Sequence, residues 1–221
     1  MKPTYILYLC VWLWSHAFAA ETSVERDLTA EFGSYSGAFA LYDEAQQRWL
    51  RYQPEQCRIR TSPCSTFKVL NSLIALRPAW PAALISPALG WHSPLHRILE
   101  SKPDFAGAFS LVLRLVLSGF GDAHQLGAIP SDHSKVGCGN NDLKGGVTQF
   151  WLQSSLTISP DEQVDFLRRL HARKLPFAAK SVDTVLDIMT LSQAGQTVFR
   201  GKTGSAFDAK KERPETWLVH R

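Results

Sequence analysis

Hydrophobic and polar residues alternate near both ends of the chain, whereas helical patterns fill much of the part between. Residues 37–42 and 49–52 are short apolar or aromatic runs around a polar stretch, and they predict an antiparallel hairpin. Residues 196–205 alternate like a further strand. Strands at both ends with helices between them predict an α+β fold, in which the last strand lies beside the N-terminal hairpin.

Three segments have the periodicity of amphipathic helices. The first, residues 65–76, carries its apolar side chains on one stripe. The second begins after Ser159, where Pro160 and Glu162 complete the pattern of a capping box. Residues 181–189 form the third. The stretch between the first two helices is rich in proline and predicts no clear order of elements.

The N-terminus has the layout of a secretory signal peptide. Lys2 supplies an early positive charge, residues 5–14 are apolar, and Ala17-Phe18-Ala19 is a small-residue cleavage site. A membrane anchor is the alternative, but a spanning helix needs roughly 20 apolar residues. We therefore expect residues 1–19 to be removed and the domain 20–221 to be periplasmic or secreted.

Length and charge set further bounds. A chain of 221 residues is long enough for one sizeable domain with its own core. The net charge of +4 is mild and its basic residues are scattered, which argues against nucleic acid or a membrane surface as a partner. We expect a small-molecule partner and no metal, and the oligomeric state stays open.

Export changes the interpretation of the cysteines. Cys57 and Cys64 flank a short segment just before Ser65, and an oxidising compartment makes a disulfide between them plausible. Such a bridge would stabilise the fold by roughly 2–3 kcal/mol. Two separate buried thiols are the alternative. A Cys57–Cys64 bridge would leave Cys138 unpaired, which is unusual for an exported protein.

A serine and a lysine at the start of the first helix form the first candidate for catalysis. Ser65 and Lys68 are three positions apart, so both lie on one helical face and the amine can reach the hydroxyl. The helix N-terminus favours a developing oxyanion, and burial would push the amine toward neutrality. The pair could equally be a helix cap and an ordinary solvated lysine, because Ser-x-x-Lys is common by chance.

The strand near the C-terminus carries the second candidate, GKTGS at residues 201–205. Gly-Lys-Thr also ends a phosphate-binding P-loop, which requires a glycine five residues before Gly201. Gln196 occupies that position and Gly195 misses it by one. The preceding residues are also strand-like, so we reject the P-loop interpretation.

Ser-x-x-Lys followed by Lys-Thr-Gly is typical of penicillin-recognising serine enzymes. Three segments, SPCSTFKVLNSLIAL, GNNDLKGGVTQFWLQSSLTISPDEQVDFLRRL and GKTGS, together resemble the class D β-lactamases, or oxacillinases. The resemblance covers residues 33–77 and 136–205. It implies an antiparallel sheet with a helical subdomain and hydrolysis of the β-lactam ring of penicillin-type antibiotics.

The resemblance also implies roles for single residues. Ser65 would become acylated by the lactam, and Lys68 would be the general base. In this family the lysine carries a carbamate formed with CO2, so no other cofactor is expected. Trp151 matches the tryptophan whose indole N–H supports the carbamate; without the resemblance, it would be a core aromatic residue.

The Lys-Thr-Gly strand would bind the substrate. Lys202 and Thr203 would meet the substrate carboxylate, and Gly204 and Ser205 continue the same substrate-binding strand. The backbone N–H groups of Ser65 and Ser205 would form the oxyanion hole.

Departures from the family pattern limit what the resemblance implies. Cys138-Gly139-Asn140 stands where the family has Tyr-Gly-Asn, and Asn140 could equally be a turn residue. The Ser-x-Val motif is expected near residues 112–113, whereas Ser110 lies two positions early. Most of residues 78–135 resembles nothing in the family, and an altered reading frame is one hypothesis for it.

The chain also ends at Arg221, where family members continue with two more strands and a helix. We therefore expect a fold incomplete at its C-terminus. Two alternatives to the hydrolase remain: a penicillin-binding protein that is acylated without turnover, and an inactive fragment of the family.

Overall fold

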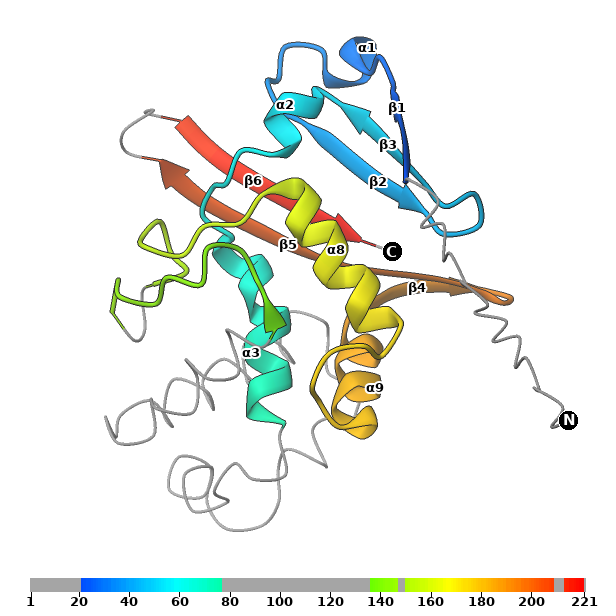
Figure 1. Ribbon diagram of the computed structural model, residues 1–221, viewed down its shortest axis with the longest axis vertical. Helices are drawn as coiled ribbons and strands as arrows, with labels where there is room; N and C mark the ends of the chain where they lie inside the picture. The colour runs from blue at the N-terminus through cyan, green and yellow to red at the C-terminus, as the bar shows by residue number, and fades with distance from the viewer. Residues whose placement is uncertain (1–20, 77–135, 147–149, 209–212, 221) are drawn as a thin grey trace, which may run out of the picture.

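The computed structural model describes residues 21–76, 136–146, 150–208 and 213–220. Its N-terminal sheet has the strand order β1-β3-β2 (Figure 1). The bounds are Thr22–Glu25 for β1, Phe39–Asp43 for β2 and Arg48–Tyr52 for β3. β2 and β3 pair in antiparallel register, which confirms the predicted hairpin, and β1 adds in parallel to β3.

The second sheet has the order β4-β5-β6 and is antiparallel throughout. Its strands are β4, Thr190–Ala194; β5, Thr197–Asp208; and β6, Arg213–His220. The prediction that β5 pairs with the N-terminal hairpin is therefore wrong. β4 and β5 are joined by the two-residue turn Gly195-Gln196, in which Gly195 has φ +59°. Because β4 and β6 together pair with every residue of β5, the partners of this strand are its neighbours in the chain and not the N-terminal hairpin.

The predicted helices are present with shifted ends. The helix expected from Ser65 begins with a 3₁₀ turn, η1 (Cys64–Phe67), and continues as α3 (Lys68–Ala75). α8 covers Pro160–His171 and α9 covers Ala179–Ile188. Two single-turn helices, α1 (Thr29–Phe32) and α2 (Pro54–Cys57), lie near the N-terminal sheet.

The capping box at the start of α8 is confirmed. The Ser159 hydroxyl accepts a hydrogen bond from the Glu162 N–H, and the Glu162 carboxylate accepts one from the Ser159 N–H. Arg60 forms an ion pair with the same carboxylate. This cap fixes the beginning of the helix next to the loop that leads to Ser65.

The core forms where α3, α8 and α9 meet residues 150–158 (Figure 1). α9 contacts both α3 and α8. The largest fully buried side chains of α3, α8 and segment 150–158 are Leu70, Leu73, Ile74, Trp151, Leu156, Ile158, Phe166 and Leu170. α9 adds the buried Val182 and Val185. The turn that carries Ser65 therefore packs against the hydrophobic core.

Several predictions fall on residues outside the described ranges. They concern the signal peptide at 1–19, Ser110 and the atypical segment 78–135. Among the helices that the structure describes, none has the length and apolar character needed to span a membrane.

Candidate active site

Ser65 and Lys68 are the accessible positions of an otherwise buried turn. Within residues 62–70, these two side chains keep partial exposure while the other seven residues are buried. Ser65 lies in η1 and Lys68 is the first residue of α3. A molecule approaching this turn can thus reach a hydroxyl and an amine from one helix start, where the helix dipole favours negative charge.

The residue before Ser65 has an unusual backbone conformation. Cys64 has φ +50°, a left-handed conformation that is rare for residues other than glycine, asparagine and aspartate. Its N–H donates to the Trp151 carbonyl at 3.1 Å, and its side chain is fully buried. Such strain concentrates at functional sites, where the surroundings hold it in place. The sequence alone contained no signal for this feature.

Segment 150–158 forms hydrogen bonds to the residues just before Ser65. The Ser62 hydroxyl donates to the Trp151 carbonyl at 2.9 Å and accepts from the Gln153 N–H at 2.8 Å. An isolated bridge joins Thr61 to Ile158. Segment 150–158 therefore fixes the path of the chain into Ser65.

Trp151 is buried within an aromatic cluster. Its ring stacks on Phe67, with centroids 5.8 Å apart and planes at 21°, and meets Phe150 edge-on at 4.8 Å. Phe67 directly precedes Lys68. The structure thus brings Trp151 next to the turn that bears the predicted base.

β5 packs against the same turn through Gly204. A Cβ on this glycine would lie 2.9 Å from the Thr66 nitrogen and 3.1 Å from the Pro63 carbonyl oxygen. No real side chain fits such a gap, because the nearest atoms belong mostly to backbone. The Lys-Thr-Gly strand and the Ser-x-x-Lys turn, 136 positions apart at Lys68 and Gly204, therefore lie in direct contact.

Lys202 occupies the same strand face as Gly204, since side chains alternate along a strand. It is buried, and its ammonium group donates to the Thr203 carbonyl. Burial first, and then the positive charge of Lys68, lower the pKa of Lys202 below its ordinary 10.5. The structure therefore brings the two lysines within electrostatic reach.

Thr203 and Ser205 alternate onto the other side of β5 and are both exposed. The four strand residues predicted to bind substrate are thus divided between two faces. Lys202 and Gly204 lie on the buried face, and only Gly204 touches the serine turn through a contact that the structure defines.

The Asn140 side chain forms hydrogen bonds to the neighbouring segment 155–157. Its amide donates to the Ser155 carbonyl at 2.8 Å, and its side-chain oxygen accepts from the Thr157 N–H at 3.0 Å. The turn interpretation thus accounts for the hydrogen bonds of this side chain. Cys138, two residues earlier, is buried in the core, and burial raises its thiol pKa to about 12.

The predicted Cys57–Cys64 disulfide is wrong, because both residues are thiols in the structure. Cys57 ends α2, and its thiol donates to the carbonyls of Phe39 and Tyr52 at 3.3 and 3.4 Å. The Cys64 thiol instead lies 3.5 Å from the Ser62 carbonyl. Each sulfur packs in a different part of the fold, so short sequence separation does not bring them into bonding geometry.

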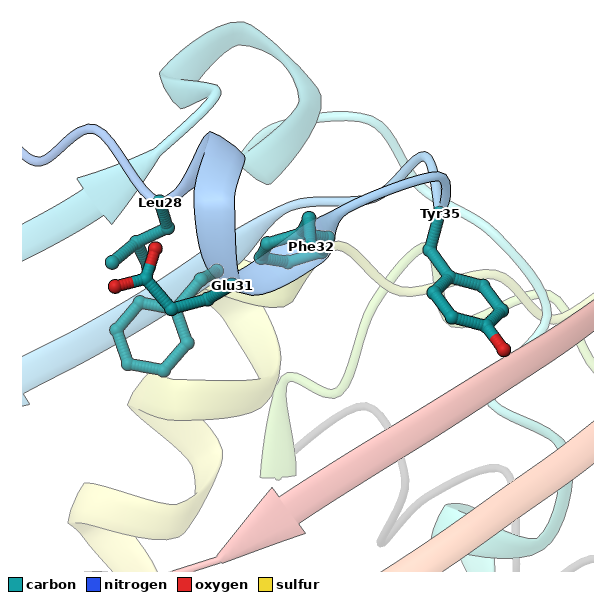
Figure 2. A pocket seen from close by; sticks show the side chains of 5 residues that line it. Leu28, Glu31, Phe32 and Tyr35 are labelled. Atoms are coloured by element: carbon teal, nitrogen blue, oxygen red, sulfur yellow. The ribbon is translucent and has the colours of Figure 1, made fainter.

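A separate hollow of about 440 Å³ lies beside α1 and β2. Figure 2 shows Leu28, Glu31 and Phe32 around α1, with Tyr35 further along the chain. None of its lining residues belongs to the predicted site.

Among the described residues, no cluster of three or more histidine, cysteine or carboxylate side chains is placed to hold a metal ion.

Known proteins resemble the chain over most of its length. Residues 126–219 match the family model for the penicillin-binding protein transpeptidase domain. Beta-lactamase OXA-9 of Klebsiella pneumoniae is 31% identical over 195 residues, which cover 76% of this chain and 68% of that protein. The chain belongs to the class D β-lactamase family. The mixed helix and sheet architecture is that of the class D and transpeptidase fold, as predicted.

Further relatives agree with this class D assignment. The probable beta-lactamase YbxI of Bacillus subtilis (strain 168) is 32% identical over 178 residues, covering 79% of this chain and 66% of YbxI. A solved class D β-lactamase from Bacillus subtilis superposes with a TM-score of 0.64 at 28% identity, covering 81% of this chain and 76% of that one.

The match extends to a protein of another kind. The regulatory protein BlaR1 of Bacillus licheniformis is 26% identical over 202 residues. These cover 86% of this class D family member but only 32% of BlaR1. The chain thus spans about two thirds of YbxI and about a third of BlaR1.

Proposed function

We propose that this protein hydrolyses the β-lactam ring of penicillin-type antibiotics through an acyl-enzyme on Ser65. The observation that carries the proposal is the accessible Ser65–Lys68 pair in an otherwise buried turn, packed directly against the Lys-Thr-Gly strand. Family membership supplies the reaction class. The signal-like residues 1–19 support a periplasmic or secreted location, where such antibiotics are met.

Ser65 is the proposed nucleophile. Its hydroxyl oxygen attacks the lactam carbonyl carbon while Lys68 takes the hydroxyl proton. The C–N bond of the lactam breaks, its nitrogen receives a proton, and an ester to Ser65 remains. Water then hydrolyses the ester and restores the hydroxyl. The backbone N–H groups of Ser65 and Ser205 are the proposed donors to the oxyanion.

Lys202 is the proposed partner of the substrate carboxylate. Its ammonium group lies on the strand face that packs against the serine turn, so it can hold an anion beside Ser65. Burial and, after it, the positive charge of Lys68 lower the pKa of Lys202 in the structure, and a bound anion would offset both effects. Substrate binding and proton affinity at Lys202 are therefore coupled.

The surroundings of Lys68 fit the carbamate that the family implies. Phe67 and Val69 on either side of Lys68 are buried, so the residue stands at the edge of the apolar core. One turn further along α3, the buried Asn71 side-chain nitrogen has no hydrogen-bond partner among the described residues. A carbamate on Lys68 would offer an acceptor oxygen to this donor. When bound, the carbamate would also supply a base for the Ser65 proton.

Acylation without turnover is the second candidate function. It is suggested by the match to BlaR1 over 86% of this chain, because that relative is named as a regulatory protein and not as a β-lactamase. In that case Ser65 would be labelled by a penicillin and the ester would persist.

One experiment separates these functions. The mature chain and its Ser65→Ala variant are incubated with a fluorescent penicillin, and turnover of a chromogenic cephalosporin is followed with and without bicarbonate. Labelling of the wild type alone together with hydrolysis supports the hydrolase. Labelling without hydrolysis at any bicarbonate level supports the second candidate. Absence of labelling in the wild type contradicts both.

A further inference from the structure

A tryptophan on β6 forms a hydrogen bond to the serine turn from the side of the sheet. The Trp217 indole N–H donates to the Ser62 carbonyl at 2.9 Å. Trp217 is half-buried and pairs across the sheet with Gly204, which packs on the same turn. Two neighbouring strand residues therefore touch the turn on either side of Ser65.

These two contacts differ in kind. Gly204 meets Thr66 and Pro63 through close packing, which resists compression but permits sliding along the strand. The bond from Trp217 is directional, because a hydrogen bond weakens steeply when its angle changes. The accepting carbonyl belongs to Ser62, whose hydroxyl is also bound to segment 150–158. The indole bond thus joins β6, the turn and that segment at one residue.

We propose that Trp217 is a positioning residue that fixes the serine turn relative to β5. The inference rests on the proposed function, because it concerns the distance between the two oxyanion donors. Those donors belong to different segments, Ser65 in η1 and Ser205 in β5, and catalytic groups must be held within about 0.5 Å. A displacement of about 1 Å can cost a factor of about 100 in rate.

The test removes a single hydrogen-bond donor, the indole N–H of Trp217. Trp217 is substituted in the full mature chain by benzothienylalanine, which keeps the shape of the ring but has sulfur in place of the indole N–H. Trp217→Phe is a second variant. Trp49 offers a control in the other sheet. It is buried, and its indole N–H likewise donates one hydrogen bond, to Glu21 at 2.6 Å.

The measured quantities are the acylation rate at saturating fluorescent penicillin, the half-saturating concentration, and hydrogen exchange of the amides of residues 61–67. We expect the Trp217 analogue to acylate about tenfold more slowly, since a net hydrogen bond is worth about a factor of ten. The half-saturating concentration should change by less than about twofold. Exchange should accelerate in residues 61–67. The Trp49 analogue should leave both the acylation rate and the exchange of residues 61–67 unchanged.

Outcomes separate this inference from the proposed function. A wild type that is not labelled contradicts the function, and hydrogen exchange alone then decides the role of Trp217. Unchanged exchange and an unchanged acylation rate in both Trp217 variants would overturn the positioning role. A loss of rate with an equal loss in the Trp49 analogue would also overturn it, because the effect would then be general destabilisation.

Discussion

Gly204 and Thr66 lie so close that a Cβ on the glycine would come within 2.9 Å of the Thr66 backbone nitrogen. This contact joins two motifs that are far apart in the sequence. It also explains why the Lys-Thr-Gly strand ends its motif in glycine, since any other residue would push the strand away from the nucleophile.

The first prediction concerns this contact. Gly204→Ala should lower the acylation rate of Ser65 by about a factor of 100, because the strand must move by several tenths of an ångström or more. Overpacking should also lower the free energy of unfolding by about 1–3 kcal/mol. Labelling kinetics and urea unfolding measure the two effects.

A matched control is Gly37→Ala. A Cβ at Gly37 would meet the Phe32 ring at 2.8 Å, which is a side chain that can turn aside. Acylation should be unaffected in this variant. If Gly204→Ala acylates as fast as Gly37→Ala, the close packing of β5 on the serine turn has no catalytic value.

The second prediction concerns the alkaline pH dependence of stability. The folded pKa of Lys202 is lowered below 10.5, so the unfolded chain binds more protons between that lowered pKa and 10.5. The contribution of Lys202 to the free energy of unfolding must therefore rise with pH through this window. Urea unfolding from pH 7 to 10.5 should show a rise that is absent in Lys202→Met.

Lys68 supplies part of this shift, so Lys68→Met should raise the pKa of Lys202. The nitrogen resonance of a labelled Lys202 side chain reports its titration directly. A Lys202 that titrates identically with and without Lys68 would show that the two charges do not interact.

Sequence patterns predicted the local elements better than their assembly. The α8 cap at Ser159 and Glu162 was predictable because its chemistry lies within four residues. The contact of Gly204 with Thr66 depends on long-range packing, so no local pattern specifies it. The expected order of strands and the likeness to a known family indicated only that the two motifs lie in the same region. The left-handed Cys64 could not be predicted, because its conformation is imposed by the Trp151 carbonyl 87 positions away.

The third prediction tests the cap. Ser159→Ala removes the acceptor of the Glu162 N–H and should lower the free energy of unfolding by about 1 kcal/mol. Ser159→Asp retains an acceptor and should lose less. Urea unfolding measures both, and equal losses in the two variants would indicate that the bond to the N–H contributes nothing.

The fourth prediction concerns the cysteines. Reduction should leave the Tm unchanged, because Cys57 and Cys64 are not bridged. Burial raises the pKa of the Cys57 thiol to about 11 and that of Cys138 to about 12, so few thiolates exist at pH 8. Iodoacetamide at pH 8 should therefore leave both unmodified in the folded protein and modify both in urea. A Tm that falls by several degrees on reduction would contradict this prediction and support a disulfide between Cys57 and Cys64.

The fifth prediction concerns Asn71. Its side-chain nitrogen has no hydrogen-bond partner in the part of the chain that the structure describes, and it should donate to a carbamate on Lys68. Asn71→Leu should therefore weaken the ¹³C carbamate signal that labelled bicarbonate produces. Ser72→Ala is the control, since its hydroxyl donates instead to the Lys68 carbonyl at 2.8 Å. If Asn71→Leu retains the full signal and unfolds at a higher urea concentration than the wild type, the amide is merely an unsatisfied polar group. Its removal would then relieve the cost of burying a donor without an acceptor.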